Sequence, residues 1–144
     1  MSPIGRLLRY LWAAPNTLLG LALGALALLL GARVRRYRGV LEFSGGALGR
    51  GITCLPPPLA FSAMTLGHVI LAVDASALAQ LRRHERVHVH QYELWGPLFL
   101  PAYVLSSLLQ LLRGRNPYRE NHFERQAYAA SAPRRVAHGS SPRS

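Results

Sequence analysis

His84, Glu85 and His88 form the pattern H-E-x-x-H, and no other part of the sequence is as well suited to chemistry. On a helix, residues four positions apart lie on one face, so both imidazoles can reach the same metal ion. Neutral histidine is a good ligand for Zn²⁺. A glutamate that directly follows the first ligand can reach a water on the metal and act as a general base. We therefore expect His84 and His88 to bind metal and Glu85 to be catalytic.

A catalytic zinc site needs a third protein ligand and an open fourth position. Glu124 is the candidate, because it lies on a predicted helix further along the chain. If residues 94–112 crossed a membrane, Glu124 would lie about 28 Å from His84 and could not share an ion with it. Pro97 and Pro101, near the start of that stretch, instead favour a turn that brings the chain back. A helical hairpin would then place the two side chains at the same level.

Each of these residues also has a simpler interpretation. The H-E-x-x-H segment is alternatively a solvated helix face rich in histidine and arginine. Glu124 is alternatively an exposed glutamate paired with Arg119 or Arg125. His68 precedes the helix in a β-prone segment, where it is either a substrate contact or auxiliary ligand, or a polar residue whose hydrogen bonds are satisfied locally.

Two helices must position the candidate ligands. A spacing of three and four runs from Leu78 to Tyr92, and Asp74 or Ser76 can cap the start of this helix. Asn116 followed by Pro117 is typical of a second helix start, and that helix is expected to run to about Ala130.

The segment before the first of these helices has the pattern of short strands and turns. Residues 40–43 alternate between apolar and polar types and are followed by Gly45-Gly46, which indicates a turn. The triple proline at 56–58 interrupts the chain again. Residues 65–73 form a β-prone run. We expect strands between residues 39 and 75.

The N-terminal segment is expected to be a membrane anchor. Residues 10–32 carry no charge, and a helix of this length spans roughly 30 Å of hydrocarbon. Tyr10 and Trp12 lie at one end, as interfacial aromatic residues do. A cleaved signal peptide is the competing interpretation, but the apolar run is long and is followed by four arginines within residues 33–38.

The formal net charge is +11, and all 17 basic residues are arginine. Most of these arginines lie beside the two uncharged stretches, where they would face anionic lipid headgroups. Membrane lipid is therefore the expected partner, and nucleic acid is not. More arginines follow the anchor than precede it, which places the rest of the chain on the cytoplasmic side of the cell membrane.

These residues resemble the gluzincin zinc metallopeptidases, in which H-E-x-x-H is followed by a glutamate ligand in an N-x-x-E-x-x-A setting. Asn121, Glu124 and Ala127 match that setting. The resemblance implies that a strand before the active-site helix binds substrate, and residues 65–70 occupy that place. Many gluzincins have an acidic residue four positions after the ligand glutamate, whereas this chain has Tyr128. About two-thirds of the chain also resembles a family of small bacterial membrane proteins with no established activity.

The sequence as a whole predicts an α+β protein that ends in a zincin-like helical hairpin. We expect a membrane anchor over residues 1–38, a membrane-associated domain over 39–130 and a disordered basic tail over 131–144. The predicted function is hydrolysis of peptide bonds in a peptide or membrane protein, with Zn²⁺ as cofactor. The alternatives are a non-catalytic metal-binding protein and a metal-free integral-membrane adaptor.

Overall fold

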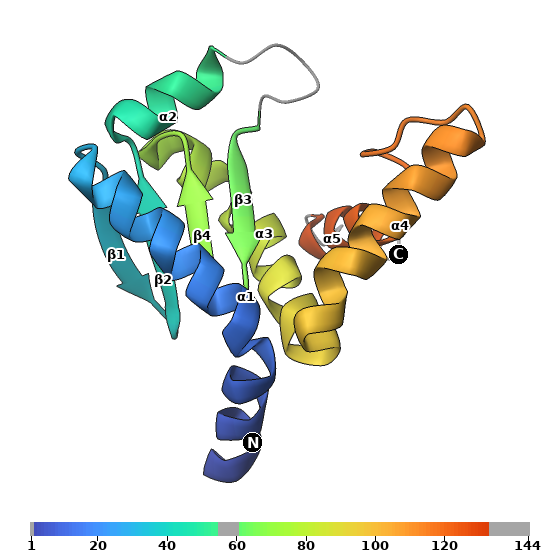
Figure 1. Cartoon of the computed structure of the whole chain (residues 1–144), viewed down its shortest axis with the longest axis horizontal. Coiled ribbons are helices and arrows are strands. Elements are labelled where there is room, and N and C mark those ends of the chain that lie inside the picture. Colours follow the sequence, from blue (N-terminus) through green and yellow to red (C-terminus); the bar gives the residue numbers. More distant parts are fainter. Residues whose placement is uncertain (1, 55–60, 133–144) are drawn as a thin grey trace, which may run out of the picture.

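The computed structural model describes residues 2–54 and 61–132 of the chain. A long apolar helix comes first, a small four-stranded sheet follows, and helices complete the fold (Figure 1). The elements are α1 (Pro3–Leu29), β1 (Arg33–Tyr37), β2 (Val40–Ser44), α2 (Gly46–Thr53), β3 (Ala63–Leu66), β4 (Val69–Ala72), α3 (Ala75–Trp95), η1 (Gly96–Leu98), α4 (Phe99–Leu112) and α5 (His122–Ser131). The α+β class predicted from the sequence is confirmed. The triple proline and most of the predicted tail, residues 133–144, lie outside the described residues.

The sheet has the strand order β1-β2-β4-β3, with β2 and β4 parallel and the outer pairs antiparallel. The predicted strand at 40–43 is confirmed as β2. The prediction of one β-prone run over 65–73 needs correction, because a tight turn at Gly67 and His68 divides it into β3 and β4. Gly67 has a φ of 59°, which a residue with a side chain rarely adopts. Strand β1 and helix α2 were not predicted.

Helix α1 packs along one face of the sheet through small residues. A Cβ atom at Gly20 would lie 2.8 Å from the backbone oxygen of Leu66, and one at Gly24 would lie 2.5 Å from the ring of Phe43. Glycine is therefore required at both positions for the helix to approach the sheet this closely. The contact buries Val69 completely and places α1 in the same core as the sheet.

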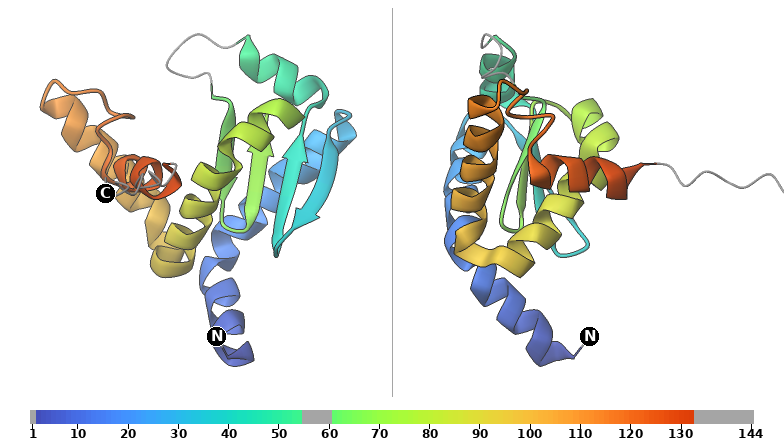
Figure 2. Two further views of the ribbon diagram at one scale, coloured as in Figure 1. Left: turned by 180° about the vertical axis from the view of Figure 1, so that it is seen from behind. Right: turned by 90° about the vertical axis from the view of Figure 1, so that its right-hand side faces the viewer.

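Helix α3 covers the other face of the sheet (Figure 2). Its start is confirmed, since the carboxylate of Asp74 accepts a hydrogen bond from the amide of Ala77 at 2.8 Å. Its buried face combines apolar residues such as Leu78 and Val89 with the polar H-E-x-x-H residues. The site is therefore built into the packed face of α3, and the interpretation as a solvated helix face does not fit.

The chain reverses twice after α3. Gly96 has a φ of 55°, and α4 leaves this corner in a new direction (Figure 1). The last helix begins at His122, so the predicted start at Pro117 was wrong. The side chain of Asn116 instead accepts hydrogen bonds from the next turn. Asn121 is the actual cap, accepting from the amide of Phe123 and donating to Tyr103 on α4.

Two stretches are long and apolar enough to cross a membrane, judged by length and composition. They are Pro3–Leu29 and Ala75–Leu112. The first is α1, which agrees with the predicted position of the N-terminal apolar helix. The second is interrupted at Gly96, where α3 ends and the chain turns.

Candidate metal centre

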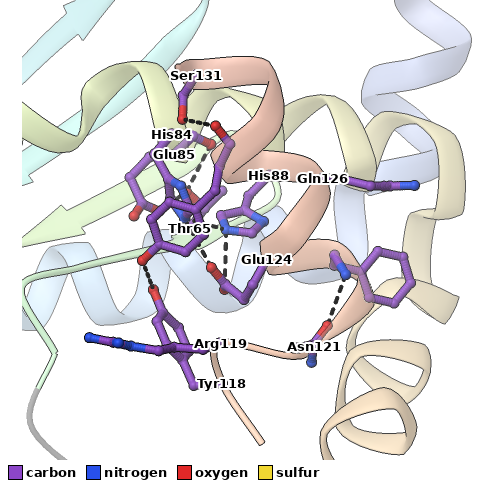
Figure 3. A network of polar contacts seen from close by, with 12 residues as sticks. Thr65, His84, Glu85, His88, Tyr118, Arg119, Asn121, Glu124, Gln126 and Ser131 are labelled. Atoms are coloured by element: carbon purple, nitrogen blue, oxygen red, sulfur yellow. Dashed lines mark hydrogen bonds and ion pairs between the residues drawn. The ribbon is translucent and has the colours of Figure 1, made fainter. Parts of the chain in front are cut away.

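Helices α3 and α5 bring His84, His88 and Glu124 together (Figure 3). The Nε2 atoms of the two histidines are 3.1 Å apart. One oxygen of Glu124 lies 3.1 Å from His84 Nε2, and the other lies 3.3 Å from His88 Nε2. All three side chains are buried. These are the three residues that the sequence predicted as ligands, and we call the group the candidate metal centre, or the metal centre for short.

The geometry of the metal centre fits a small divalent cation. Ligand atoms about 2.0–2.1 Å from a tetrahedral ion lie roughly 3.3–3.4 Å from one another. His84 Nε2 lies 3.1 Å from His88 Nε2 and 3.1 Å from Oε2 of Glu124, and with one ligand atom from each residue the three atoms lie within 4.8 Å of one another, so the three residues are near enough to hold one ion. Two imidazoles and one carboxylate also make up the donor set of many hydrolytic zinc sites, in which the fourth position stays open.

Glu85 lies beside the metal centre and is held by strand β3. The hydroxyl of Thr65 donates a hydrogen bond of 2.7 Å to Oε2 of Glu85. The same hydroxyl lies 3.2 Å from the backbone oxygen of Glu85, so the helix and the strand are joined at this point. Only 4% of Glu85 is exposed. Thr65 therefore fixes the orientation of the predicted base.

Gln91 orients His88. Its side-chain oxygen lies 2.8 Å from Nδ1 of His88, which places a proton on that nitrogen and directs Nε2 toward His84 and Glu124. When this ring is neutral, Nε2 carries the lone pair that a metal ion would use. The amide nitrogen of Gln91 donates to the backbone oxygen of Phe123 and to the side chain of Gln126. One side chain thus fixes the ring of a ligand and joins α3 to α5.

Glu124 is positioned from α4. The hydroxyl of Tyr103 donates to Oε1 of Glu124 at 2.7 Å. Asn121, three residues before Glu124, donates to the backbone oxygen of Tyr103 and to the hydroxyl of Ser107. The start of α5 is therefore attached to α4, and the carboxylate that it carries is held by the same tyrosine.

His84 lacks the support that His88 has. Its Nδ1 atom is buried and has no hydrogen-bond partner within residues 2–54 and 61–132. The ring of Tyr128 lies against it, with a centroid separation of 4.5 Å. Tyr128 occupies the position at which many gluzincins have an acidic residue. An aromatic contact here takes the place of a hydrogen bond to the first histidine.

The charges of the metal centre depend on one another. Burial would raise the pKa of the Glu124 carboxyl, but its hydrogen bonds with His84 and His88 hold that pKa well below its usual range. Burial would lower the pKa of His88, but its interactions with Glu124 raise it. Burial raises the pKa of Glu85, and the hydrogen bond from Thr65 opposes this shift. Glu124 is therefore suited to remain ionised, and Glu85 to exchange a proton.

His68 lies apart from the metal centre. Its Nε2 atom is 3.3 Å from Oε1 of Glu93, and its Nδ1 atom is 3.4 Å from the hydroxyl of Thr17. Its ring stacks on Tyr10 at 3.9 Å, and Arg9 donates to the other oxygen of Glu93. The structure thus places His68 in a group that joins α1 to α3. Both ring nitrogens of His68 thus lie near protein partners, but these partners come from α1 and α3 and are not local in the sequence.

Thr65, Gln91 and Tyr103 were not singled out as site residues from the sequence. Gln91 comes three residues after His88, so helical spacing alone would have placed it near that ring. Thr65 and Tyr103 had no comparable signal, because their approach depends on how β3 and α4 pack against α3.

Comparison of the chain with protein-family models, curated proteins and solved structures finds no match.

Proposed function

We propose that this protein is a membrane-associated, zinc-dependent peptidase. The observation that carries the proposal is the convergence of His84, His88 and Glu124 from two helices, with their ligand atoms within 4.8 Å of one another. Glu85, beside them, is the general base. The fold around the site is zincin-like in this proposal, with the histidines on one helix and the glutamate on a later one.

Zinc is the proposed metal because of the donor set. Two imidazole nitrogens and a carboxylate suit zinc better than magnesium or calcium, which prefer oxygen ligands. A zinc ion bound here would supply Lewis acidity, making water nucleophilic near neutral pH and polarising a carbonyl. His84, His88 and Glu124 would hold it. Gln91 and Tyr103 would keep two of these ligands in position.

Glu85 would take a proton from the attacking water and deliver it to the leaving amine. Thr65 engages Oε2 of its carboxylate, and this contact directs Oε1 to be the atom that exchanges the proton. Burial raises the pKa of Glu85, which brings it nearer to the value at which one group can serve as both base and acid.

Strand β3 is the proposed binding site for the substrate backbone. It is an edge strand of the sheet and pairs only with β4 in the described part of the chain. An edge strand can accept an extended peptide as an additional strand. Thr65 joins β3 to Glu85, so a peptide added here would lie beside the site. The substrates would be peptides or membrane proteins near the bilayer surface.

The test measures metal content and activity in the same preparations. Detergent-purified wild type should contain close to one zinc per chain, and His84→Ala and Glu124→Ala should both contain less. Glu85→Gln should keep its zinc but lose peptidase activity against a mixed peptide library read by mass spectrometry. Glu120→Gln is a matched control, because Glu120 precedes the α5 cap and lies outside the metal centre.

Each other result has a definite meaning. A folded wild type without metal would overturn the zinc site and favour the metal-free adaptor. Wild-type activity in Glu85→Gln would overturn the catalytic role of that residue. If wild type and Glu85→Gln both bind zinc and neither shows peptidase activity, the protein is a non-catalytic metal-binding protein.

A further inference from the structure

Helix α1 buries its small side chains and exposes its large ones. The buried stripe consists of Ala13, Asn16, Gly20, Gly24 and Ala27. Gly20 and Gly24 lie against the sheet, and Asn16 donates a hydrogen bond to the backbone oxygen of Gly96 at the corner after α3. The outward residues include Leu8, Leu11, Leu18, Leu19, Leu26 and Leu29, each more than one-third exposed. A helix on the surface of a water-soluble protein has the opposite arrangement, with large apolar residues inward and polar residues outward. Small residues at the packing face are characteristic of helices in lipid. The outer face of α1 therefore needs an apolar cover.

Helix α4 also exposes its large apolar side chains. Its one buried residue is Phe99, near the corner with α3. Its exposed apolar residues are Val104, Leu105, Leu108, Leu109, Leu111 and Leu112. In the side view, α1 and α4 lie on one side of the sheet, α3 crosses its other face, and α5 extends toward that other side (Figure 2). We call α1 with α4 the apolar layer; its exposed apolar side chains are those just named, whereas another side of α4 carries Tyr103, which contacts Glu124 of the metal centre.

The sheet prevents α1 from crossing a bilayer in this conformation. Gly20 and Gly24 hold α1 directly against the sheet, so the sheet would have to enter the hydrocarbon with the helix. Strands β1 and β3 are open edges, and lipid-exposed sheet edges do not occur in the hydrocarbon region. Strand β1 also carries exposed arginines at 33, 35 and 36, and arginine is costly at that depth.

The charges around the apolar layer match an anionic lipid surface. Arg6 precedes the uncharged part of α1, and the arginines of β1 follow it. Arg113 and Arg115 follow α4 directly and are exposed. The chain as a whole has a net charge of +11. Basic residues beside an apolar surface are attracted to anionic headgroups while the apolar side chains enter the acyl region.

We propose that α1 and α4 insert together into a single leaflet of an anionic bilayer and that neither helix crosses it. The chain is attached from one side, and both ends of α1 lie on that side. The metal centre is then held on the aqueous side of the apolar layer, next to the lipid surface. This attachment depends on packing and surface charge alone and does not require the metal or the peptidase activity.

Topology gives the first test. In a Cys54→Ser background, which removes the only native cysteine, single cysteines are placed at Ser2, Arg35 and Arg113. An impermeant maleimide is applied to spheroplasts and to inverted membrane vesicles expressing the full chain. All three sites should react from the same side, in protein that remains with the membranes. Labelling of Ser2 and Arg35 from opposite sides would show that α1 crosses and would overturn the proposal. Recovery of the chain in the soluble fraction would also overturn it.

Vesicle flotation of the purified chain gives the second test. The probe is large vesicles of phosphatidylcholine with or without phosphatidylglycerol. Leu19→Glu on α1 and Leu108→Glu on α4 should each weaken binding about tenfold or more, because each places a carboxylate in the acyl region. Ala79→Glu is the matched control, since Ala79 is exposed on α3, outside the apolar layer, and gains the same charge. It should bind within about twofold of wild type.

The controls separate the possible failures. Equal losses in Leu19→Glu and Ala79→Glu would show that net charge, and not the apolar layer, drives binding, and would overturn the proposal. Circular dichroism checks that each variant is folded. Zinc is measured in the same samples. If the chain floats with the vesicles but contains no zinc, the membrane proposal stands and the proposed peptidase function fails. If it contains zinc but does not float, the membrane proposal fails and the proposed function stands.

Discussion

The metal centre and the cluster formed by His68, Glu93 and Arg9 contain similar side chains, and α3 contributes to both. In the cluster, both ring nitrogens of His68 lie near protein partners and the carboxylate of Glu93 binds an arginine. In the metal centre, no arginine accompanies the carboxylate of Glu124 among its hydrogen-bond and ion-pair partners in the described residues, and two Nε2 atoms face it. In the cluster, the histidine and the glutamate help to hold α1 to α3, and we call this group the lock. In the metal centre, the same residue types form a candidate ligand set.

The difference lies in what neutralises the carboxylate. A guanidinium is a permanent cation, so the charge of Glu93 is already balanced at neutral pH. No permanent cation lies among the hydrogen-bond and ion-pair partners of Glu124 in the described residues, and a divalent cation bound there would provide the compensating charge. Four predictions test this contrast, in order of decreasing expected effect.

The largest effect is expected from removing one histidine of each group. His84→Ala should reduce zinc affinity by more than about a hundredfold, because loss of a ligand should exceed the 10–100-fold typical of loss of a supporting residue. His68→Ala should leave zinc affinity unchanged, although it removes a buried ring of the same type. Competition with a zinc chelator measures both. Equal losses of affinity would mean that the contrast between the two groups is wrong.

The next effect concerns the support of His88. Gln91→Leu removes the acceptor for Nδ1 of His88 and should lower zinc affinity about 10–100-fold. Gln80→Leu, at an exposed position on the same helix, is the control and should not change it. The same chelator competition applies, with a melting curve to check folding. Unchanged affinity in Gln91→Leu would show that the orientation of His88 is set by other contacts.

Zinc affinity is expected to rise when Tyr128 is replaced by glutamate. Tyr128→Glu places a carboxylate in the space now filled by the ring that contacts His84. It can accept a hydrogen bond from the buried Nδ1 atom of His84, which has no partner within the described ranges. Zinc affinity should rise about tenfold. Tyr128→Gln, which has a similar shape without the charge, should give a smaller gain. A loss of affinity in Tyr128→Glu would show that the aromatic contact is itself required.

The smallest effect concerns how the cluster of His68, Glu93 and Arg9 stabilises the fold as the pH falls. Burial would raise the pKa of Glu93, but its hydrogen bonds with His68, His90 and Arg9 lower that pKa below its usual range. A carboxyl whose pKa is lower in the folded state stabilises the fold above its unfolded pKa of about 4.3 and loses this contribution as the pH falls through the folded value. At pH 7 the free energy of unfolding of the wild type should be about 1–2 kcal/mol higher than that of Glu93→Gln.

Denaturant melts between pH 7 and pH 3 measure this difference, which should shrink as the solution becomes more acidic. A stability difference that stays constant over the whole range would mean that the ionised form of Glu93 does not hold the lock. The metal-free protein is used throughout, so that loss of zinc in acid does not contribute.

Local sequence determined the helix that carries the histidines. Spacing within a helix is fixed by its backbone hydrogen bonds, so His84 and His88 share one face wherever α3 lies. The strand at 40–43 likewise depends on neighbouring residues and was predicted from them, and of the two predicted caps, Asp74 and Ser76, Asp74 is the one used. The uncharged stretch at the N-terminus was sufficient to predict a long apolar helix.

Tertiary packing decided which side chains approach His84 and His88 from other parts of the chain. The sequence nominated Glu124, but its approach depends on the corner at Gly96 and on the aromatic contacts of Phe123 with α4. The choice of Asn121 over Asn116 as the cap of α5 also depends on α4, because Asn121 donates to Tyr103. Contacts between residues far apart in the chain have no fixed spacing, so the sequence could nominate Glu124 and a turn near Pro97 but not the side-chain contacts that hold Glu124 and Asn121 in place.

The same division applies to α1. Its composition specified an apolar helix, but composition cannot distinguish a free span from a helix packed on a sheet. Only the close approach of Gly20 and Gly24 to the sheet shows which face of α1 is buried and which is left exposed. The sequence thus determined the chemistry of each element, and packing determined the partners with which that chemistry acts.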